Sequence, residues 1–359
     1  MAPSSKGSPA RGDFADRSLP AARVQAKAGA KYACELPLDS SNALVITGSM
    51  SSNPEDRSLS RDQIWPVQVV IDGAAYVVPF FRAVGDLGVS SIAFVNPSNP
   101  SAPVFFSAGS DLWQLDCMSR LLLDCGIQDL VDVHEISHEQ DRILIANTGA
   151  DEVLSYCPRG GGVARIALAP FRGRVNSLSE AGRRAADRFH VNQAFRGLDG
   201  HLWALVHHFE GWQLLRRVMG SVVKTQGDGG VLNLEEKIAI NLNLAAPHSA
   251  RIVNGEYWLM NSACNEIVVY SRAWQKLRTI PTIGWGRGLA ISGDIAYAGL
   301  SPVRKRYRLP SDRSVLQPIL QAVRLSTGEP LAQAPILNVE QVNNVYCVAR
   351  AVGELLVSL

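Results

Sequence analysis

The feature of this sequence that most constrains its fold is a hairpin-sized unit that occurs more than once. In each of two segments a histidine is followed seven residues later by a turn residue and thirteen residues later by an asparagine. The pattern runs through His134, Asp141 and Asn147, and again through His248, Gly255 and Asn261. Each copy reads as strand, tight turn and strand. Internal repeats of this size indicate propeller blades or a solenoid.

Short runs of β-branched and aromatic residues, bounded by Gly, Pro, Ser, Asn or Asp, dominate the chain. Repeat units start near residues 89, 131, 190, 247, 286 and 341. This number predicts an all-β fold, a six-bladed β-propeller. The ring would be closed by pairing strands from both ends of the chain, Leu44–Thr47 and Glu354–Leu359. A pair of β-sandwiches is the alternative, but it does not explain the repeat.

The N-terminal part of the chain differs from the rest. Residues 1–35 are predicted to be a disordered tail, and residues 36–359 a single propeller domain. The tail is rich in Pro, Ser, Gly and basic residues and lacks the apolar centre of a secretory signal. No segment approaches the ~20 consecutive apolar residues of a membrane-spanning helix, so we expect no membrane partner.

Charge and cysteine usage narrow the class of protein further. The net charge of +2 argues against nucleic acid as a partner, because that binding depends on neutralising phosphates. The six cysteines form no C-x-x-C pair, which is typical of scattered free thiols and predicts a cytoplasmic protein. The sequence contains neither a G-x-x-x-x-G-K-[ST] phosphate loop nor a G-x-S-x-G nucleophile elbow.

Three histidines are the main candidates for chemistry. Equivalent positions of successive blades converge on one axis, and His134, His190 and His248 each stand at or just before a strand that would line it. His190 is offset by three residues from strict equivalence, so it needs a bulge or a different height to join the others. We predict these histidines as catalytic groups. They would hold a Zn²⁺, Fe²⁺ or Mn²⁺ ion with an open position, act as metal-free acid–base groups, or bond neighbouring backbone and order the channel.

Other polar residues are predicted to support these histidines. Asp132 shares a strand face with His134 and would orient its ring, unless it caps the strand end. Asn192 shares a face with His190 and would bind a substrate carbonyl, or else open backbone groups.

A glycine-rich segment contributes the predicted anion ligand. Arg287 lies in Gly284–Gly288, and a guanidinium suits a carboxylate or phosphate, although pairing with a neighbouring blade is the alternative. The predicted substrate-binding set is completed by Arg251, Asn147 and Asn261. The pair His207 and His208 is a weaker candidate, because it ends a strand where only one of the two can face inward.

The order of four motifs is also informative. They are D-x-H at 132–134, D-R-x-H-x-N at 187–192, P-H-S-x-R at 247–251, and R-G-L-A followed by G-L-S-x-V-R between 287 and 304. In this order they resemble an uncharacterised bacterial family of β-propeller proteins, a domain-of-unknown-function family. Val191 and Gln193 depart from the Leu and the Gly or Ser that its members tend to have there. The resemblance implies a propeller fold and implies no reaction.

Together these features predict an enzyme that acts on a small anionic molecule at the mouth of the propeller channel. A lyase, hydrolase or cyclase reaction is expected, by analogy with the chemistry that propellers host. The alternative is a non-catalytic binding or scaffold propeller that presents its rim to a protein or glycan partner.

Overall fold

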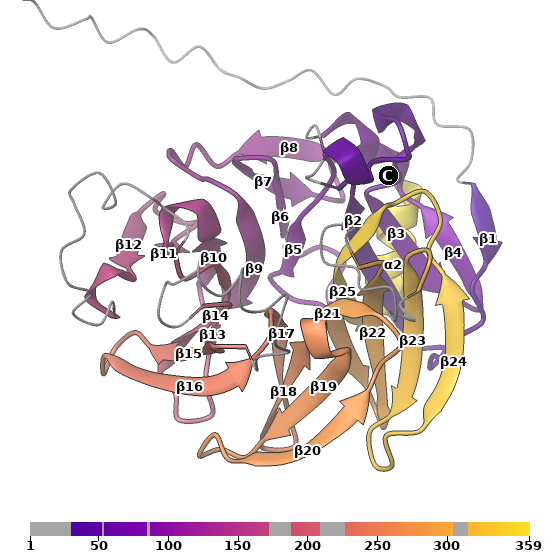
Figure 1. Ribbon diagram of the computed structural model, residues 1–359. Coiled ribbons are helices and arrows are strands. Elements are labelled where there is room, and N and C mark those ends of the chain that lie inside the picture. The colour runs from indigo at the N-terminus through magenta and orange to yellow at the C-terminus, as the bar shows by residue number, and fades with distance from the viewer. Residues whose placement is uncertain (1–29, 52–53, 85–86, 172–187, 209–226, 304–314) are drawn as a thin grey trace, which may run out of the picture.

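The computed structural model is a six-bladed β-propeller, as the repeat predicted, with six sheets arranged around a central axis (Figure 1). It describes residues 30–51, 54–84, 87–171, 188–208, 227–303 and 315–359. Residues 1–29 of the predicted tail, Asp187 and Arg304 lie outside this part of the chain.

We number the blades in chain order. Blade 1 contains β1 (Lys31–Ala33), β2 (Asn42–Ser49), β3 (Val67–Ile71), β4 (Ala74–Val77) and β25 (Gln341–Ala349). Blade 2 contains β5 (Ser91–Phe94), β6 (Val104–Ala108), β7 (Asp111–Asp116) and β8 (Leu121–Asp124). Blade 3 contains β9 (Val133–Glu139), β10 (Arg142–Asn147), β11 (Glu152–Tyr156) and β12 (Val163–Ala167).

Blade 4 contains β13 (Val191–Arg196), β14 (Leu202–Val206), β15 (Gly229–Asn233) and β16 (Ile238–Leu244). Blade 5 contains β17 (Pro247–Val253), β18 (Glu256–Asn261), β19 (Glu266–Tyr270) and β20 (Lys276–Pro281). Blade 6 contains β21 (Trp285–Ser292), β22 (Ile295–Ser301), β23 (Ile319–Arg324) and β24 (Pro330–Pro335).

The described helices are short. The 3₁₀ turns are η1 (Pro54–Asp56), η2 (Arg61–Gln63), η3 (Pro79–Ala83), η4 (Thr148–Ala150), η5 (Ala169–Phe171) and η7 (Ser262–Cys264). An α-helix, α2 (Arg350–Ser358), follows the last strand.

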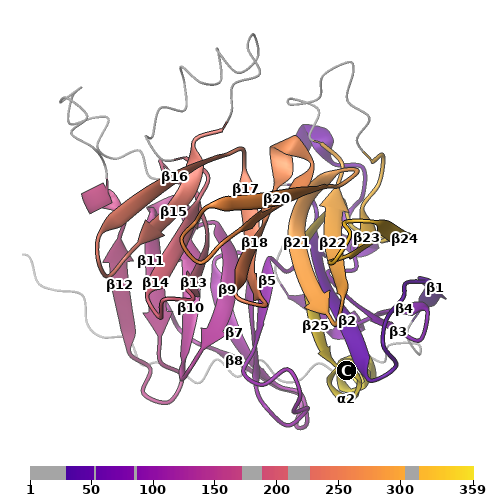
Figure 2. The ribbon, with the colours of Figure 1, turned by 90° about the horizontal axis from the view of Figure 1, so that it is seen from below.

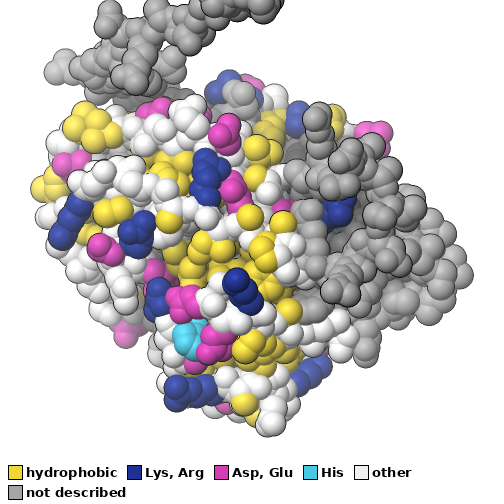
Figure 3. Space-filling model, turned by 90° about the vertical axis from the view of Figure 1, so that its left-hand side faces the viewer, with side chains coloured by type: hydrophobic (Ala, Val, Ile, Leu, Met, Phe, Trp, Pro, Cys, Tyr) yellow, Lys and Arg dark blue, Asp and Glu magenta, His cyan; other side chains and the backbone are white. Residues whose placement is uncertain are grey.

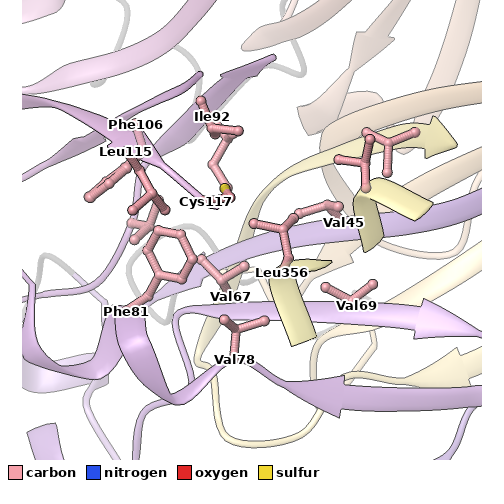
Figure 4. Packing of buried hydrophobic residues seen from close by; sticks show 14 of the residues in the cluster. Val45, Val67, Val69, Val78, Phe81, Ile92, Phe106, Leu115, Cys117 and Leu356 are labelled. Carbon is pink, nitrogen blue, oxygen red and sulfur yellow. The ribbon is translucent and has the colours of Figure 1, made fainter. Parts of the chain in front are cut away.

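Blade 1 closes the ring, but not with the strand that the sequence suggested. The C-terminal strand is β25, which pairs antiparallel with β2 from Asn42↔Ala349 to Ser49↔Gln341. The predicted strand Glu354–Leu359 is wrong, because Arg350–Ser358 forms α2. Its buried residues Val352 and Leu356 are four positions apart, which places them on one helical face. Figure 4 shows Leu356 beside Val45, Val67 and Val69.

Blade 1 also begins earlier than the predicted boundary at residue 36. Its outermost strand is β1, which pairs with β4 in the register Lys31↔Tyr76 to Ala33↔Ala74.

Each interface between neighbouring blades holds one hydrophobic cluster. Alternate residues of a strand point to opposite faces of the sheet, so a blade strand serves two interfaces. Ile143 and Ile145 of β10 pack toward blade 2, whereas Leu144 and Ala146 pack toward blade 4. This two-sided burial explains why the strands read as continuous apolar runs rather than as alternating ones.

The topology also fixes where the inner strands begin. Four antiparallel strands return the chain to the end of the blade where it started, so the next inner strand begins at that same end. The inner strands are β5, β9, β13, β17, β21 and β25, and neighbouring ones contact each other around the axis (Figure 2). Residues at the starts of these strands therefore share one end of the axis, which we call the axial site.

The surface and the thiols give two further findings. On the side shown in Figure 3, basic and acidic side chains are interspersed with hydrophobic ones, without a large area of one charge. All six cysteines are free thiols. Among the helices described, none has the length and apolar character needed to cross a membrane.

Candidate functional site

The repeat seen in the sequence corresponds to one hydrogen-bond network present in blades 3 and 5. In both, the asparagine Oδ1 accepts the backbone N–H sixteen residues earlier, at 2.6 and 2.7 Å, and Nδ2 donates to a glutamate five residues later, at 2.7 Å. The two sets are Asn147 with Val131 and Glu152, and Asn261 with Ala245 and Glu266. A 3₁₀ turn follows each asparagine and ends in a left-handed residue, Asp151 or Asn265, with φ of 52° and 54°.

This network determines what Asn147 and Asn261 do. Their side chains are 0 % and 4 % exposed, and each amide bonds protein on both its oxygen and its nitrogen. Both asparagines hold the start of an inner strand against its hairpin. We therefore leave them out of the proposed ligand contacts.

Five of the chain's seven histidines form one group at the axial site, the histidine cluster. Consecutive ring centroids are 4.3 to 6.2 Å apart, through the pairs His134–His248, His134–His190, His190–His207 and His207–His208. The rings come from blades 3, 4 and 5, so the three predicted histidines do converge. The structure adds His207 and His208, which were the weaker candidates in the sequence.

The position of His190 has a local cause. The turn between β13 and β14 spans residues 197–201, whereas the equivalent turns of blades 3 and 5 are the two-residue turns 140–141 and 254–255. These extra turn residues account for most of the sequence offset. His190 itself has φ of +49°, and β13 has a register shift between Val191 and Gln193. A non-glycine residue in the left-handed region is strained, and such residues concentrate at functional sites.

His207 could have been found by counting from the turn. It lies five residues after Leu202, the first residue of β14, and Asn147 and Asn261 lie five residues after the first residues of β10 and β18. His207 is therefore the blade 4 counterpart of the two asparagines. The longer turn conceals this equivalence in the sequence.

Two of the imidazoles have identifiable partners that orient them. His248 Nδ1 lies 2.9 Å from the carbonyl oxygen of Ala246, which can only accept, so Nδ1 carries the proton and Nε2 keeps its lone pair. The hydroxyl of Ser262 lies 2.9 Å from the same nitrogen. On the other side of the cluster, Asp132 Oδ2 lies 3.6 Å from His134 Nε2, in the arrangement expected of an orienting carboxylate.

The surroundings keep these rings neutral near pH 7. Burial lowers the pKa of His134, and it lowers the pKa of His248 and His207 further. The charge of Arg287 is the next cause for His248, and the neighbouring His208 ring is the next cause for His207. The interaction with His134 holds the pKa of Asp132 well below its usual range. The site therefore combines neutral bases with an ionised carboxylate.

Arg287 supplies a fixed positive charge beside these bases. It lies at a register shift of β21 between Gly286 and Gly288, and it is half-buried. The glycines make room for protein rather than for a ligand. A Cβ on Gly288 would lie 2.5 Å from the backbone nitrogen of Val345 in β25, and one on Gly286 would overlap Met260.

Arg251 belongs to a different layer of the channel. Its guanidinium donates to Glu135 Oε1 at 2.9 Å, to Asn344 Oδ1 at 3.0 Å and to the carbonyl oxygen of Leu289 at 2.7 Å. Ser249 Oγ lies 3.4 Å from Glu135 Oε2. This network joins blades 1, 3, 5 and 6 across the axis, and we leave Arg251 out of the proposed ligand contacts.

Asn192 is buried beside the axial site, and of its two amide atoms the nitrogen has a hydrogen-bond partner. Its Nδ2 donates one of its two N–H groups to the carbonyl oxygen of Pro247 at 2.5 Å. Its Oδ1 is buried and, among the described residues, has no hydrogen-bond partner. Oδ1 is therefore an acceptor that suits a hydroxyl or amine.

The metal site predicted at His134, His190 and His248 stays a prediction. In the described part of the chain no three or more His, Cys, Asp or Glu side chains are grouped so that they could hold a metal ion.

Comparisons with known proteins support the propeller fold and do not identify a reaction. Residues 207–352 match the model of a family described as Domain of unknown function (DUF4915), which confirms the resemblance to a domain-of-unknown-function family. No curated protein matches the chain.

Solved structures resemble the chain only distantly. The nidogen/laminin complex has a TM-score of 0.53 and 9 % identity, over 86 % of this chain and 98 % of the other, and it shows the fold alone. A streptogramin B lyase structure has a TM-score of 0.39 and 12 % identity, over 69 % and 83 % of the two chains. A protein of unknown function from Bacteroides caccae has a TM-score of 0.46 and 11 % identity, over 86 % and 99 %. The last two likenesses are too weak to support an argument.

Proposed function

We propose that this propeller is an enzyme that processes a small anionic molecule by proton transfer at the axial site. The observation that carries the proposal is that five of seven histidines gather at one end of the axis, where the charge of Arg287 acts on two of them, His134 and His248. A row of largely buried imidazoles beside a guanidinium serves no packing purpose that apolar residues would not serve better.

Each group has a role in this proposal. Arg287 binds the carboxylate or phosphate of the ligand. The Nε2 lone pair of His248 accepts a proton from the bound ligand, because Nδ1 of the same ring already donates to the carbonyl oxygen of Ala246. Asp132 orients His134, and His190 completes the set of bases. Asn192 Oδ1 accepts a hydrogen bond from a ligand hydroxyl or amine.

This set of groups fits a lyase, hydrolase or cyclase, since reactions of all three types commonly use proton transfer by a general base. Anion binding brings a negative charge to neutral imidazoles, and a nearby opposite charge favours their protonated form. Binding should therefore be coupled to proton uptake and should strengthen as the pH falls toward about 6.

The first experiment measures anion binding by the full-length chain, with malonate as the probe and the imidazole NMR signals as the readout. We expect malonate to shift the signals of His134, His190 and His248. Arg287→Met should weaken binding at least about tenfold, because a charge-assisted hydrogen bond contributes about 1.5–3 kcal/mol. Arg278→Met is the matched control, since Arg278 lies on the outer strand β20 and pairs with Glu256.

Equal malonate affinity in the parent and in Arg287→Met would refute the proposed anion site. To separate catalysis from binding, hydroxy acids and phosphate esters are screened for turnover in the parent and in a His134→Asn/His248→Asn variant. Turnover that disappears in the variant supports the enzyme. A protein or glycan ligand bound equally by both proteins would instead support the non-catalytic propeller.

Metal dependence is tested separately. The protein is purified without added metal or a histidine-rich tag and compared with a His134→Ala/His248→Ala variant by elemental analysis. Near-stoichiometric Zn, Fe or Mn that is lost from a folded variant would establish a histidine metal centre. Absence of metal from both proteins would leave the metal-free acid–base site.

A further inference from the structure

We infer that His207, His208 and Asp228 form a second half of the axial site, which binds a second polar group of the ligand. The inference rests on the proposed function. It assigns His207 as a ligand-contacting residue, and it assigns Asp228 as a positioning residue that acts through His208.

Among the described residues, the side chain at position 207 makes none of the frame hydrogen bonds that its counterparts in blades 3 and 5 make. In blades 3 and 5 the equivalent asparagine accepts the N–H of the residue sixteen positions earlier. After correction for the longer turn, the corresponding N–H in blade 4 belongs to Arg188. That N–H is accepted by Asp151 Oδ2 of blade 3 at 2.7 Å, and the next one, of Phe189, by Asp151 Oδ1 at 2.9 Å. The strand start is therefore held without the side chain of residue 207.

The imidazole of His207 is directed into the histidine cluster. The His207 ring lies 5.3 Å from His190 and 4.3 Å from His208, centroid to centroid. Its backbone serves the hairpin, since His207 N–H donates to the carbonyl oxygens of Phe189 and His190. A histidine at a place where an asparagine forms the hairpin frame in two other blades indicates a role in the site.

His208 has a stacking partner on one side and a carboxylate partner at its Nδ1. Its ring stacks on His207 with an interplanar angle of 9°. Its Nδ1 lies 3.2 Å from Oδ1 of Asp228, whose side chain is 6 % exposed. The carboxylate fixes the ring orientation and the protonated nitrogen of His208, as Asp132 does for His134. Two imidazoles of the cluster, His134 and His208, therefore each have a carboxylate beside them.

The two halves of the axial site define the class of ligand that we propose. One anionic group binds at Arg287, and a second acceptor group, such as another carboxylate or a carbonyl oxygen, meets His207 and His208. A dicarboxylate suits this arrangement better than a monocarboxylate of the same kind.

The test compares acetate with malonate, succinate and glutarate on the full-length chain, with imidazole NMR signals as the readout. We expect the best dicarboxylate to bind at least about tenfold more tightly than acetate, a difference of about 1.4 kcal/mol, and to shift the signals of His207 and His208. His207→Asn should abolish that preference while leaving acetate binding intact. Its melting temperature should change little, because asparagine is the residue of the other two blades.

Asp228→Asn tests the positioning role. We expect it to change the pH midpoint of the His208 ring signals and to weaken dicarboxylate binding, which a purely structural carboxylate would not do. Dicarboxylates that shift only His134, His190 and His248, with the preference retained in His207→Asn, would overturn this inference and leave the proposed function standing. Anions that shift none of the five rings would refute both.

Discussion

At the scale of single residues, the axial site is built from side chains whose ordinary state is changed by burial. Burial lowers the pKa of His134, His207 and His248. Neighbouring histidines, and for His134 and His248 also the charge of Arg287, lower it further. The polypeptide also accepts strain here, since His190, Asp132, Ala246 and Ser249 all have φ between 47° and 54°.

The lowered pKa values predict how stability depends on pH. The unfolded chain protonates these histidines below about pH 6.5, whereas the folded chain does not yet take up those protons. The free energy of unfolding should therefore fall as the pH drops from about 6.5 toward the folded pKa values. Thermal unfolding across this range should show a weaker pH dependence in His248→Asn than in the parent. An unchanged slope in His248→Asn, matching that of the control His201→Asn, would contradict this.

Gly288 gives a second prediction at this scale. A methyl group there would meet backbone atoms of β25 at 2.5 to 2.8 Å, and backbone cannot move aside as a flexible side chain can. We expect Gly288→Ala to destabilise the protein by about 1–3 kcal/mol, as overpacking does elsewhere. Denaturant unfolding measures this, with Gly160→Ala as the control because a Cβ added at Gly160 would have no atom within 4 Å. Similar losses in both variants would show that the close approach of β21 to β25 is not the cause.

At the scale of elements, the recurring unit is a hairpin with its own frame. The asparagine that closes each frame joins the start of the inner strand to the turn after the second strand, and the same distances recur in blades 3 and 5. Blade 4 keeps the hairpin but receives the corresponding bonds from Asp151 of blade 3. In blade 4, His207 therefore stands where blades 3 and 5 have the frame asparagine, and the hairpin is kept.

Removing a frame asparagine should therefore cost stability and leave ligand binding alone. Asn261→Ala leaves the half-buried N–H of Ala245 without its acceptor and removes a partner of Glu266, at a cost of about 2 kcal/mol. Chemical denaturation gives the loss, and the malonate titration gives the affinity, which should match that of the parent. A weakened malonate affinity in a fully folded Asn261→Ala protein would show that Asn261 takes part in ligand binding after all.

At the scale of the whole molecule, the ring is held by strand pairing within blade 1, by packing between blades and by hydrogen bonds across its axis. Pairing of β25 with β2 joins the two ends of the chain in one blade, and six apolar clusters fill the six interfaces. Across the axis, Arg251 bonds partners from three other blades.

The axial ion pair should be costly to break from one side. Arg251→Met leaves the buried Glu135 carboxylate without its partner, and we expect a loss of about 3 kcal/mol. The Glu135→Gln/Arg251→Met double variant should recover part of this loss, because no uncompensated charge remains. Unfolding free energies of the parent, both single variants and the double variant complete the cycle. Simple additivity of the two single losses would contradict coupling between the side chains.

The all-β repeat, the number of blades and the convergence of His134, His190 and His248 could all be predicted from the amino-acid sequence. These follow from local signals, because turn residues and apolar runs fix each hairpin and equivalent hairpins meet at the axis. Only the tertiary contacts decided which polar side chains bond protein groups in the hairpins and across the axis. Asn147, Asn261 and Arg251 have the same chemistry as ligand-binding residues, and only their partners, from turns and from neighbouring blades, separate the two roles.

His207 was hidden for a related reason, since a turn three residues longer displaced it in sequence while pairing kept it in place. The final apolar residues formed the helix α2 rather than the closing strand because β25 already occupied the edge of β2. In both cases the local sequence pattern indicates which structures a segment can form. The contacts that the segment makes in the folded ring decide which of them it adopts.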